Sequence, residues 1–226
     1  MHILLRKYCY FFIGDCMYNL IYYFWNFVIG SFFGFLCETV WCFIKLGHFE
    51  SRKGLIYGFF IPIYGIATVI ISLFVSILDI HSIFLFLVIT FFICAVVEYF
   101  SSYFQEKCFA TKSWDYSEMK LNLHGRINFV YLLAWSFLGI FWCKYSYDLI
   151  TFFLAFLIKI DMLYIFTFIF FVYMLFNVFI SCAASYRQKL RRNGKQANNW
   201  FDSFLDKKYN DDRLKKVYSN AIFINK

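Results

Sequence analysis

The sequence is poor in the residues that soluble domains place on their surfaces and in their loops. Of its 226 residues only 16% are charged, against about 25% in ordinary soluble domains, and Pro62 is the one proline. Hydrophobic residues make up 62% of the chain. A soluble core cannot accommodate that much apolar surface, and a disordered chain would carry far less of it. The composition excludes both classes and predicts a polytopic membrane protein.

The spacings that mark metal, disulfide and nucleotide sites are also lacking. The eight cysteines are scattered without a CxxC pair, and the four histidines are equally dispersed, which argues against a zinc site or a disulfide framework. There is no GxxxxGK[ST] phosphate loop and no Ser/His/Asp or Cys/His spacing of a nucleophilic site. We therefore expect no bound metal, no cofactor and no enzymatic activity.

What the chain has instead is five apolar runs, each about as long as the roughly 20 residues that a helix needs to cross a bilayer. They are continuous rather than alternating, which is typical of helices. The sequence predicts an all-α membrane bundle of about five transmembrane helices within a domain of residues 19–186, with spans at about 19–44, 58–78, 82–104, 127–147 and 162–185.

Two segments fit no span. Residues 1–18 are partly apolar but carry Arg6, Lys7 and Asp15, so they can be an interfacial helix, a signal-like segment or translation from a misplaced start. Residues 149–158 are too short to cross and are followed by Lys159 and Asp161. We interpret them as a separate interfacial or re-entrant piece.

Basic residues set the expected orientation. Of the 22 lysines and arginines, 18 lie between spans one and two, between spans three and four, or after span five. By the positive-inside rule these segments are cytoplasmic, so we expect a cell-membrane protein with its N-terminus outside, an outside turn at residues 79–81 and a cytoplasmic basic tail at 187–226. Bases placed beside membrane helices do not indicate nucleic-acid binding.

The tail has an amphipathic pattern. Trp200, Phe201, Phe204 and Leu205 recur at helical spacing and are followed by Lys207 and Lys208. The pattern predicts a helix on the anionic inner leaflet, or else a docking helix for a soluble partner.

Two carboxylates, Glu38 and Glu98, lie within predicted spans, where ionisable groups are costly and usually face protein or water. Glu38 shares a helix face with Gly30 and Gly34, and the second span offers a stripe of small or polar residues that includes Gly58, Pro62 and Gly65. We expect an interior polar cluster that also involves cations from the loops: Glu38, Glu98, Arg126, Arg52 and Lys53. It can serve as structural ion pairing, as a ligand site, or in proton or ion handling.

The two basic loops resemble each other. Each follows a Glu-bearing span and re-enters the membrane at a glycine, so helix N-termini that suit anions point at the inner surface. This pattern suggests a parallel two-fold repeat of helix pairs. The second loop also carries a candidate motif with interface-seeking aromatic residues: Trp114, Asp115, Tyr116, His124 and Gly125.

At these residues the chain resembles a known family, the putative ABC-transporter type IV membrane proteins, or CmpB-like permeases. Departures are Phe59, where the family often has proline, and His124, where asparagine is common. The resemblance covers about residues 25–142 and rests on Gly34-Phe35-Leu36-Cys37-Glu38, Gly58 with Pro62-Ile63-Tyr64-Gly65, Glu98-Tyr99, Trp114-Asp115-Tyr116-Ser117 and Asn122-Leu123-His124-Gly125-Arg126-Ile127.

The resemblance implies a permease-like transport component of unknown substrate. Because the chain has no ATPase domain, that role requires a separate cytoplasmic ATPase subunit, and a homo-oligomer is also compatible with it. The alternative is a membrane protein that binds an anionic lipid or regulates a partner without transport.

Overall fold

The computed structural model describes residues 16–78 and 82–224. The long helices are α2 (Cys16–Leu46), α3 (Pro62–Ile77), α4 (Ile83–Phe109), α5 (Phe129–Lys159) and α6 (Leu163–Arg192), followed by the short α7 (Trp200–Lys208) and α8 (Asp211–Val217). Four two-residue strands make two small antiparallel sheets: β1 (Thr111–Lys112) with β4 (Ile222–Phe223), and β2 (Asn122–Leu123) with β3 (Ile127–Asn128). The predicted all-α membrane architecture is confirmed.

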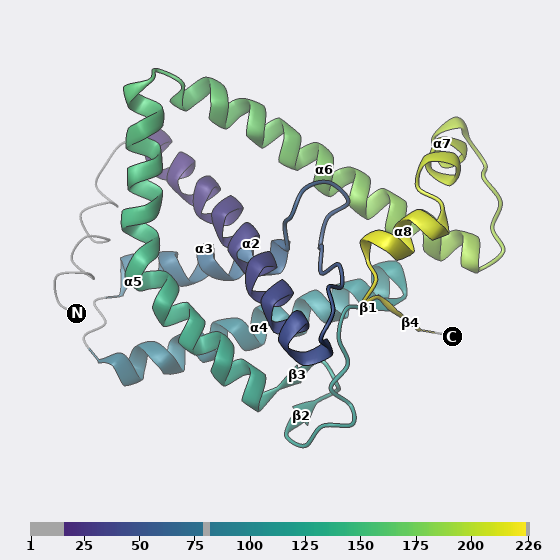
Figure 1. Ribbon diagram of the computed structural model, residues 1–226, viewed down its shortest axis with the longest axis horizontal. Helices are drawn as coiled ribbons and strands as arrows, with labels where there is room; N and C mark the ends of the chain where they lie inside the picture. The colour runs from purple at the N-terminus through teal and green to yellow at the C-terminus, as the bar shows by residue number, and fades with distance from the viewer. Residues whose placement is uncertain (1–15, 79–81, 225–226) are drawn as a thin grey trace.

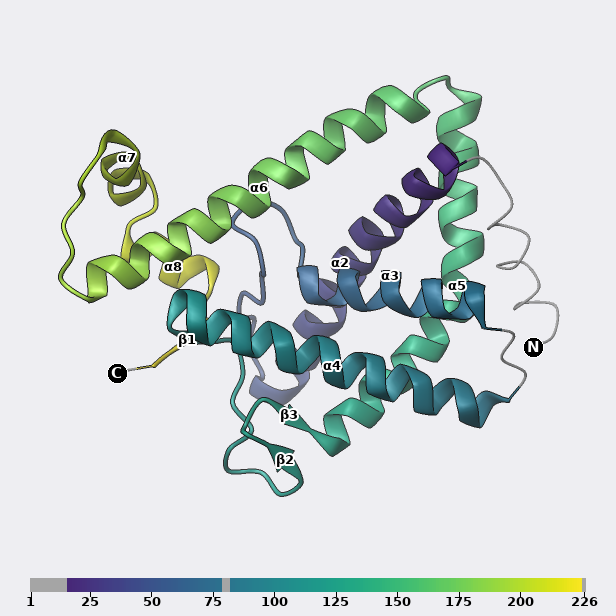
Figure 2. The ribbon, with the colours of Figure 1, turned by 180° about the vertical axis from the view of Figure 1, so that it is seen from behind.

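Along the long axis of the molecule α2, α4 and α6 run in one direction and α3 in the other, while α5 runs steeply across that axis (Figure 1). The start of α2, the end of α3 and the start of α4 lie toward one end, while β1, α7 and α8 lie toward the other, as the view from behind also shows (Figure 2). The loops that follow α2 and α4 are therefore brought to the same half of the molecule as the tail.

Four of these helices, α2, α4, α5 and α6, are long and apolar enough to cross a membrane. The second predicted span is shorter than expected, because α3 has only 16 residues. At 1.5 Å per residue it extends about 24 Å, less than the roughly 30 Å of a hydrocarbon core. The cause is local: Gly58 has a positive φ of 74°, and Pro62, which lacks an N–H, occupies the first turn of the helix.

The separate piece expected at residues 149–158 is wrong. These residues continue α5, which runs unbroken from Phe129 to Lys159, and the polar residues Lys144 and Asp148 lie within the helix. A few charged residues do not end a helix whose backbone hydrogen bonds continue, so the polar interruption was mistaken for a boundary. The predicted outside turn at 79–81 and residues 1–15 of the N-terminal segment lie outside the described residues.

A buried polar network ties three helices together at the centre. Asn26 of α2 donates to the Ser72 hydroxyl of α3 over 2.8 Å and accepts from the Trp142 indole of α5 over 3.2 Å. Asn26 and Ser72 are fully buried, and Trp25 beside them packs on the aromatic rings of α6. Because buried polar groups are costly unless paired, the network fixes how α2, α3 and α5 meet.

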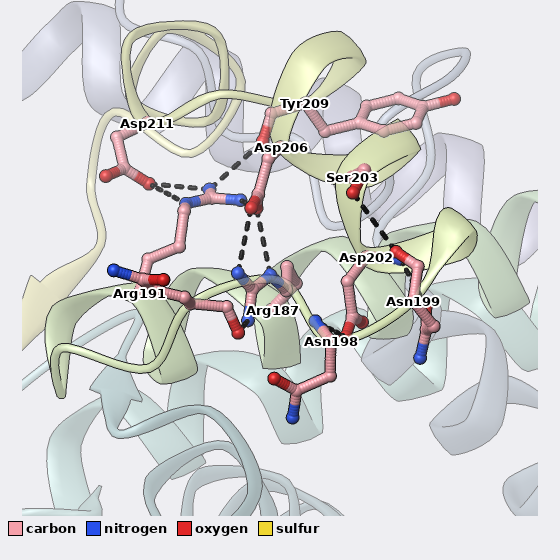
Figure 3. Close-up of polar contacts among 10 residues, drawn as sticks. Arg187, Arg191, Asn198, Asn199, Asp202, Ser203, Asp206, Tyr209 and Asp211 are labelled. Atoms are coloured by element: carbon pink, nitrogen blue, oxygen red, sulfur yellow. Dashed lines mark hydrogen bonds and ion pairs between the residues drawn. The ribbon is translucent and has the colours of Figure 1, made fainter.

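The tail folds back onto the end of α6 (Figure 1). The Arg187 side chain, which is 3% exposed, donates twice to Asp206 over 2.9 and 2.8 Å, and Arg191 contacts both Asp206 and Asp211 (Figure 3). Leu205 of α7 is buried in a cluster with Ile180 and other residues of α6. Most of the apolar side of the predicted amphipathic helix thus packs on protein, whereas Trp200 is 79% exposed, so membrane contact by this residue stays a prediction.

Candidate functional site

The helices line a partly open cavity of about 800 Å³, a size typical of ligand sites. Its walls come from α2, α3, α4, α5 and the end of α6, from the loops after α2 and α4, and from the tail residues Tyr218, Asn220 and Ala221. Both predicted intramembrane carboxylates, Glu38 and Glu98, line it, together with Arg52 and Lys53. The structure therefore brings four of the five residues of the predicted polar cluster to one space.

Glu38 is positioned by the close contact of α2 and α3. Gly34, one turn before it, lies against the Tyr64 ring so tightly that a Cβ at Gly34 would overlap the ring. The Tyr64 hydroxyl donates to Glu38 Oε1 over 2.6 Å. Gly30 and Gly65 form equally close contacts, with Thr68 and with Ser31 and Phe27 respectively. Gly30, Gly34 and Gly65, which the sequence predicts to pack helices together, thus bring α2 and α3 close enough for the Tyr64 hydroxyl to reach Glu38.

Not every residue of the predicted packing set contributes in this way. Pro62 begins α3 as expected, but Gly58 lies in the loop before the helix, so its assignment to a helix face is wrong. A Cβ at Gly58 would meet the Phe60 ring. Its positive φ makes it a turn residue that redirects the chain before α3.

Glu98 is the more deeply buried carboxylate, at 7% exposure. The Tyr116 hydroxyl donates to its Oε1 over 3.2 Å. Among the described residues no group donates to its Oε2, and that atom is shielded from solvent. A buried acceptor without a partner costs about 1–3 kcal/mol. Among the described residues, Glu98 Oε2 and the Arg52 Nε are the charge-bearing atoms of the cavity wall left in this state.

The predicted pairing of a glutamate with Arg126 is wrong. Arg126 forms its ion pair with Glu106 and lies over the rings of Tyr99 and Tyr103, away from the cavity lining. Glu106 was missed because the third span was expected to end at 104, whereas α4 continues to Phe109. The extra turn carries a carboxylate that is closer to Arg126 than either intramembrane glutamate can be.

The other two loop cations lie on the cavity wall with partners of their own. Arg52 pairs with Glu50 over 3.0 Å and donates to the Cys42 sulfur, while Lys53 lies 4.5 Å from the centre of the Phe59 ring. Burial acts to lower the pKa of Arg52, but the hydrogen bond to Cys42 and the negative charges of Glu50 and, to a smaller extent, Glu38 outweigh it and raise the pKa. Arg52 therefore stays charged.

The loop motif folds into a small unit that holds Tyr116 above Glu98. The Trp114 indole donates to the Arg126 carbonyl over 2.8 Å, and the Tyr116 N–H donates to the Gly125 carbonyl over 2.9 Å. Gly125 has a φ of 66°, and a Cβ there would overlap Ser117. His124 contacts the Tyr99 hydroxyl over 3.0 Å, which ties the unit to α4.

Asp115 closes this unit. Its Oδ1 accepts from both the N–H and the hydroxyl of Ser117, and its Oδ2 pairs with Lys112 over 3.2 Å. The Ser117 hydroxyl bond, helped by the Ser117 N–H and Lys112, lowers the Asp115 pKa. The five motif residues are thus close in space, and their shared effect is to position the tyrosine rather than to form a reactive centre.

The first loop is held by a residue that sequence reasoning did not find. Asn177 of α6 accepts from the Tyr57 N–H over 3.1 Å and donates to the Tyr57 carbonyl over 2.6 Å, so its amide takes the place of a neighbouring strand. Ser181, one turn later, accepts from the Ile56 N–H. In the sequence, Asn177 is distinguished only as a polar residue within the apolar run of the fifth predicted span.

Comparison with known proteins finds a family match that covers most of the cavity wall and its loops. No curated protein and no solved structure matches the chain. A family model described as putative ABC-transporter type IV matches residues 25–182. The match begins in α2 and ends in α6, so it contains α3, α4, α5 and both loops, and it extends beyond the residues quoted for the resemblance. By this match over most of its length, the chain is a multi-pass membrane protein that belongs to the putative ABC-transporter type IV family.

Proposed function

We propose that the protein is the membrane-embedded, ligand-binding component of a transport system. The observation that carries the proposal is the cavity of about 800 Å³ with Glu38 and Glu98 in its wall, each bound only by a tyrosine hydroxyl among the described residues. Ionisable groups buried in membrane helices usually mark substrate or ion pathways. The cavity also lies within the residues that match the transporter family.

In this proposal ATP hydrolysis belongs to a separate subunit, because the sequence contains no phosphate loop. The ends of α2, α4 and α6, the loops after α2 and α4, and the tail together hold 18 of the 22 lysines and arginines in the sequence, and their described parts lie toward one half of the molecule. We assign this half to the cytoplasm by the positive-inside rule. An ATPase subunit would then contact the same loops that carry Arg52 and Tyr116, and so could act on the cavity wall.

The orientation has a direct test. In a variant without native cysteines, Cys at Glu118 should be protected from an impermeant thiol reagent added outside cells, whereas Cys at Asp161 should be labelled. Both positions are exposed: Glu118 lies in the segment between β1 and β2, and Asp161 in the turn between α5 and α6. Figure 1 shows these two segments in opposite halves of the molecule. Labelling of residue 118 but not of residue 161 would invert the proposed orientation.

A second function is favoured by one observation. The tail residues Tyr218, Asn220 and Ala221 form part of the cavity wall, so an occupant of the cavity would contact the tail directly. Lys45, Arg52 and Lys53 line the same cavity and would suit an anionic headgroup. A protein that senses such a lipid and regulates a partner through its tail, without transport, would be built in this way.

Purification separates the two functions. The full chain is isolated in a mild detergent, and its bound proteins and lipids are identified by mass spectrometry. Co-purification of an ATPase whose hydrolysis rate changes when the full chain is removed supports transport. A stoichiometric anionic lipid without an ATPase supports the second function and contradicts the first.

A further inference from the structure

We infer that the cavity binds an organic cation with an apolar body, whose positive centre lies against Glu98 and Glu38. This inference rests on the proposed ligand-binding role of the cavity and specifies the chemistry of its occupant. It begins from Glu98, because its Oε2 is buried and has no hydrogen-bond partner among the described residues; on the cavity wall the Arg52 Nε is the other charge-bearing atom in that state.

Glu98 supplies the main argument. The residue is more than nine-tenths buried, lines the cavity, and has a carboxylate oxygen to which no described residue donates. Neither Glu98 nor Glu38 forms an ion pair within the described residues, and each accepts one hydrogen bond from a neutral tyrosine hydroxyl. An uncompensated carboxylate in such a setting is strongly unfavourable, so it either takes up a proton or gains a positive partner. A cation in the cavity would supply that partner to Glu98, whereas Glu38 also feels the charge of Arg52.

The walls around the carboxylates suit a cation that also carries apolar groups. Trp41, Trp135 and Trp142 line the cavity, as do Tyr64, Tyr116 and Tyr131. Tyr64 and Trp135 meet edge to face, with ring centres 5.4 Å apart, and Tyr116 stacks on Tyr131 at 5.0 Å. Aromatic faces attract ammonium and related cations, most strongly where water is excluded.

The basic residues on the wall do not reverse this conclusion. Arg52 already pairs with Glu50, and Lys53 lies over the Phe59 ring, so part of their charge is compensated by protein groups. Lys45 lies in the last turn of α2 and is exposed to solvent. Glu38 and Glu98 lie within α2 and α4, away from the helix ends, whereas Lys45 lies in the last turn of α2 and Arg52 and Lys53 lie in the loop after it. An anion would therefore be attracted to the rim but repelled from the interior.

Two probes of the same shape and opposite charge test the inference. Tetraphenylphosphonium is an apolar organic cation, and tetraphenylborate is its anionic counterpart. Binding of each to the purified full chain in detergent is measured by equilibrium dialysis, with empty micelles subtracted. We expect saturable binding of tetraphenylphosphonium at one site per chain and no saturable binding of tetraphenylborate.

Substitutions locate the site. Glu98→Gln keeps the shape and the acceptor for Tyr116, and Glu38→Gln does the same for Tyr64. Each should weaken tetraphenylphosphonium binding by roughly 10- to 100-fold, the loss expected for one charged contact. Glu118→Gln removes the same charge from an exposed loop residue that does not line the cavity, and should leave binding unchanged.

Three results would overturn the inference: binding of tetraphenylborate but not of tetraphenylphosphonium, binding of neither ion, or cation binding that is equal in Glu98→Gln and wild type. In the last case Glu98 is neutral and needs no cation. None of these results bears on whether the chain works with an ATPase, since that is decided by co-purification and hydrolysis. A failure of the cation assignment is thus distinguishable from a failure of the transport proposal.

Discussion

The contact between Gly34 and Tyr64 yields the sharpest stability prediction. In Gly34→Ala the new methyl group overlaps both the ring and the Cβ of Tyr64, so either the Tyr64 side chain or the whole of α3 must move. Overpacking of this kind costs about 1–3 kcal/mol. If the ring moves, the hydrogen bond to Glu38 is lost as well, at about 1.5–3 kcal/mol for a charged acceptor. The better helix propensity of alanine returns about 1 kcal/mol, leaving a net loss of about 1.5–5 kcal/mol when both costs apply.

A matched substitution is available in α5. Gly139 is also a buried helical glycine, but a Cβ there would meet Ile71 and Thr90 at 3.4 Å, an ordinary contact distance. Gly139→Ala should therefore be neutral or slightly stabilising. Unfolding of both variants is followed by circular dichroism in mixed micelles with rising denaturing detergent.

Double variants show whether the loss of stability in Gly34→Ala comes from its contact with the Tyr64 ring. The penalty of Gly34→Ala should persist in Tyr64→Phe, which keeps the ring, and should shrink in Tyr64→Ala, which removes it. If Gly34→Ala is as stable as Gly139→Ala, or if its penalty is unchanged in Tyr64→Ala, then the proposed role of this contact in placing Tyr64 is refuted.

Three further predictions concern the tail and the first loop. Asp206→Asn removes the ion pair of the buried Arg187 and should weaken tail docking by about 1–3 kcal/mol, measured by hydrogen exchange. Asp211→Asn changes a largely exposed carboxylate and should cost at most about 1 kcal/mol. Equal effects of the two substitutions would contradict the role of Asp206 in holding the tail on α6. Because the bond from Arg187 lowers the Asp206 pKa below the ordinary value of about 3.9, docking should be constant from pH 5 to 8 and weaken as the pH falls below about 4, and Asp206→Asn should remove this dependence on pH. Asn177→Ala leaves two backbone groups of the first loop unpaired and should cost about 2–4 kcal/mol in detergent unfolding, more than Ser181→Ala, which removes one bond; the reverse order would refute the role of the Asn177 amide.

The helices could be predicted from the sequence because apolar length and continuity are local properties. The first, third and fifth spans appear within a few residues of their expected starts, as α2, α4 and α6. The errors lie at the ends of spans. The third span was expected to end at 104 and the fourth at 147, yet α4 continues through Glu106 to Phe109 and α5 continues through Asp148 to Lys159.

The site was predictable in part. That Glu38 and Glu98 share an interior followed from their helix faces, whereas no sequence pattern indicated that the loop motif would gather around Tyr116. Their hydrogen-bond partners did not follow, because Tyr64 and Tyr116 are two of 18 tyrosines and only the three-dimensional arrangement shows which hydroxyls meet a carboxylate. The orientation in the membrane, the two-fold repeat and self-association stay predictions.

The contribution of Tyr218, Asn220 and Ala221 to the cavity wall has a consequence for biosynthesis. These residues leave the ribosome only after α2 to α6 have been made, so the helices must enter the bilayer while the cavity is still missing one side. The wall is closed afterwards, when β4 pairs with β1 and the Ser219 hydroxyl donates to the Ser51 carbonyl. An affinity tag or fluorescent protein fused close to β4 would hinder the pairing of β4 with β1. Some of the protein inserted in the membrane would then lack a complete cavity wall, so total protein would overestimate the fraction able to bind a ligand.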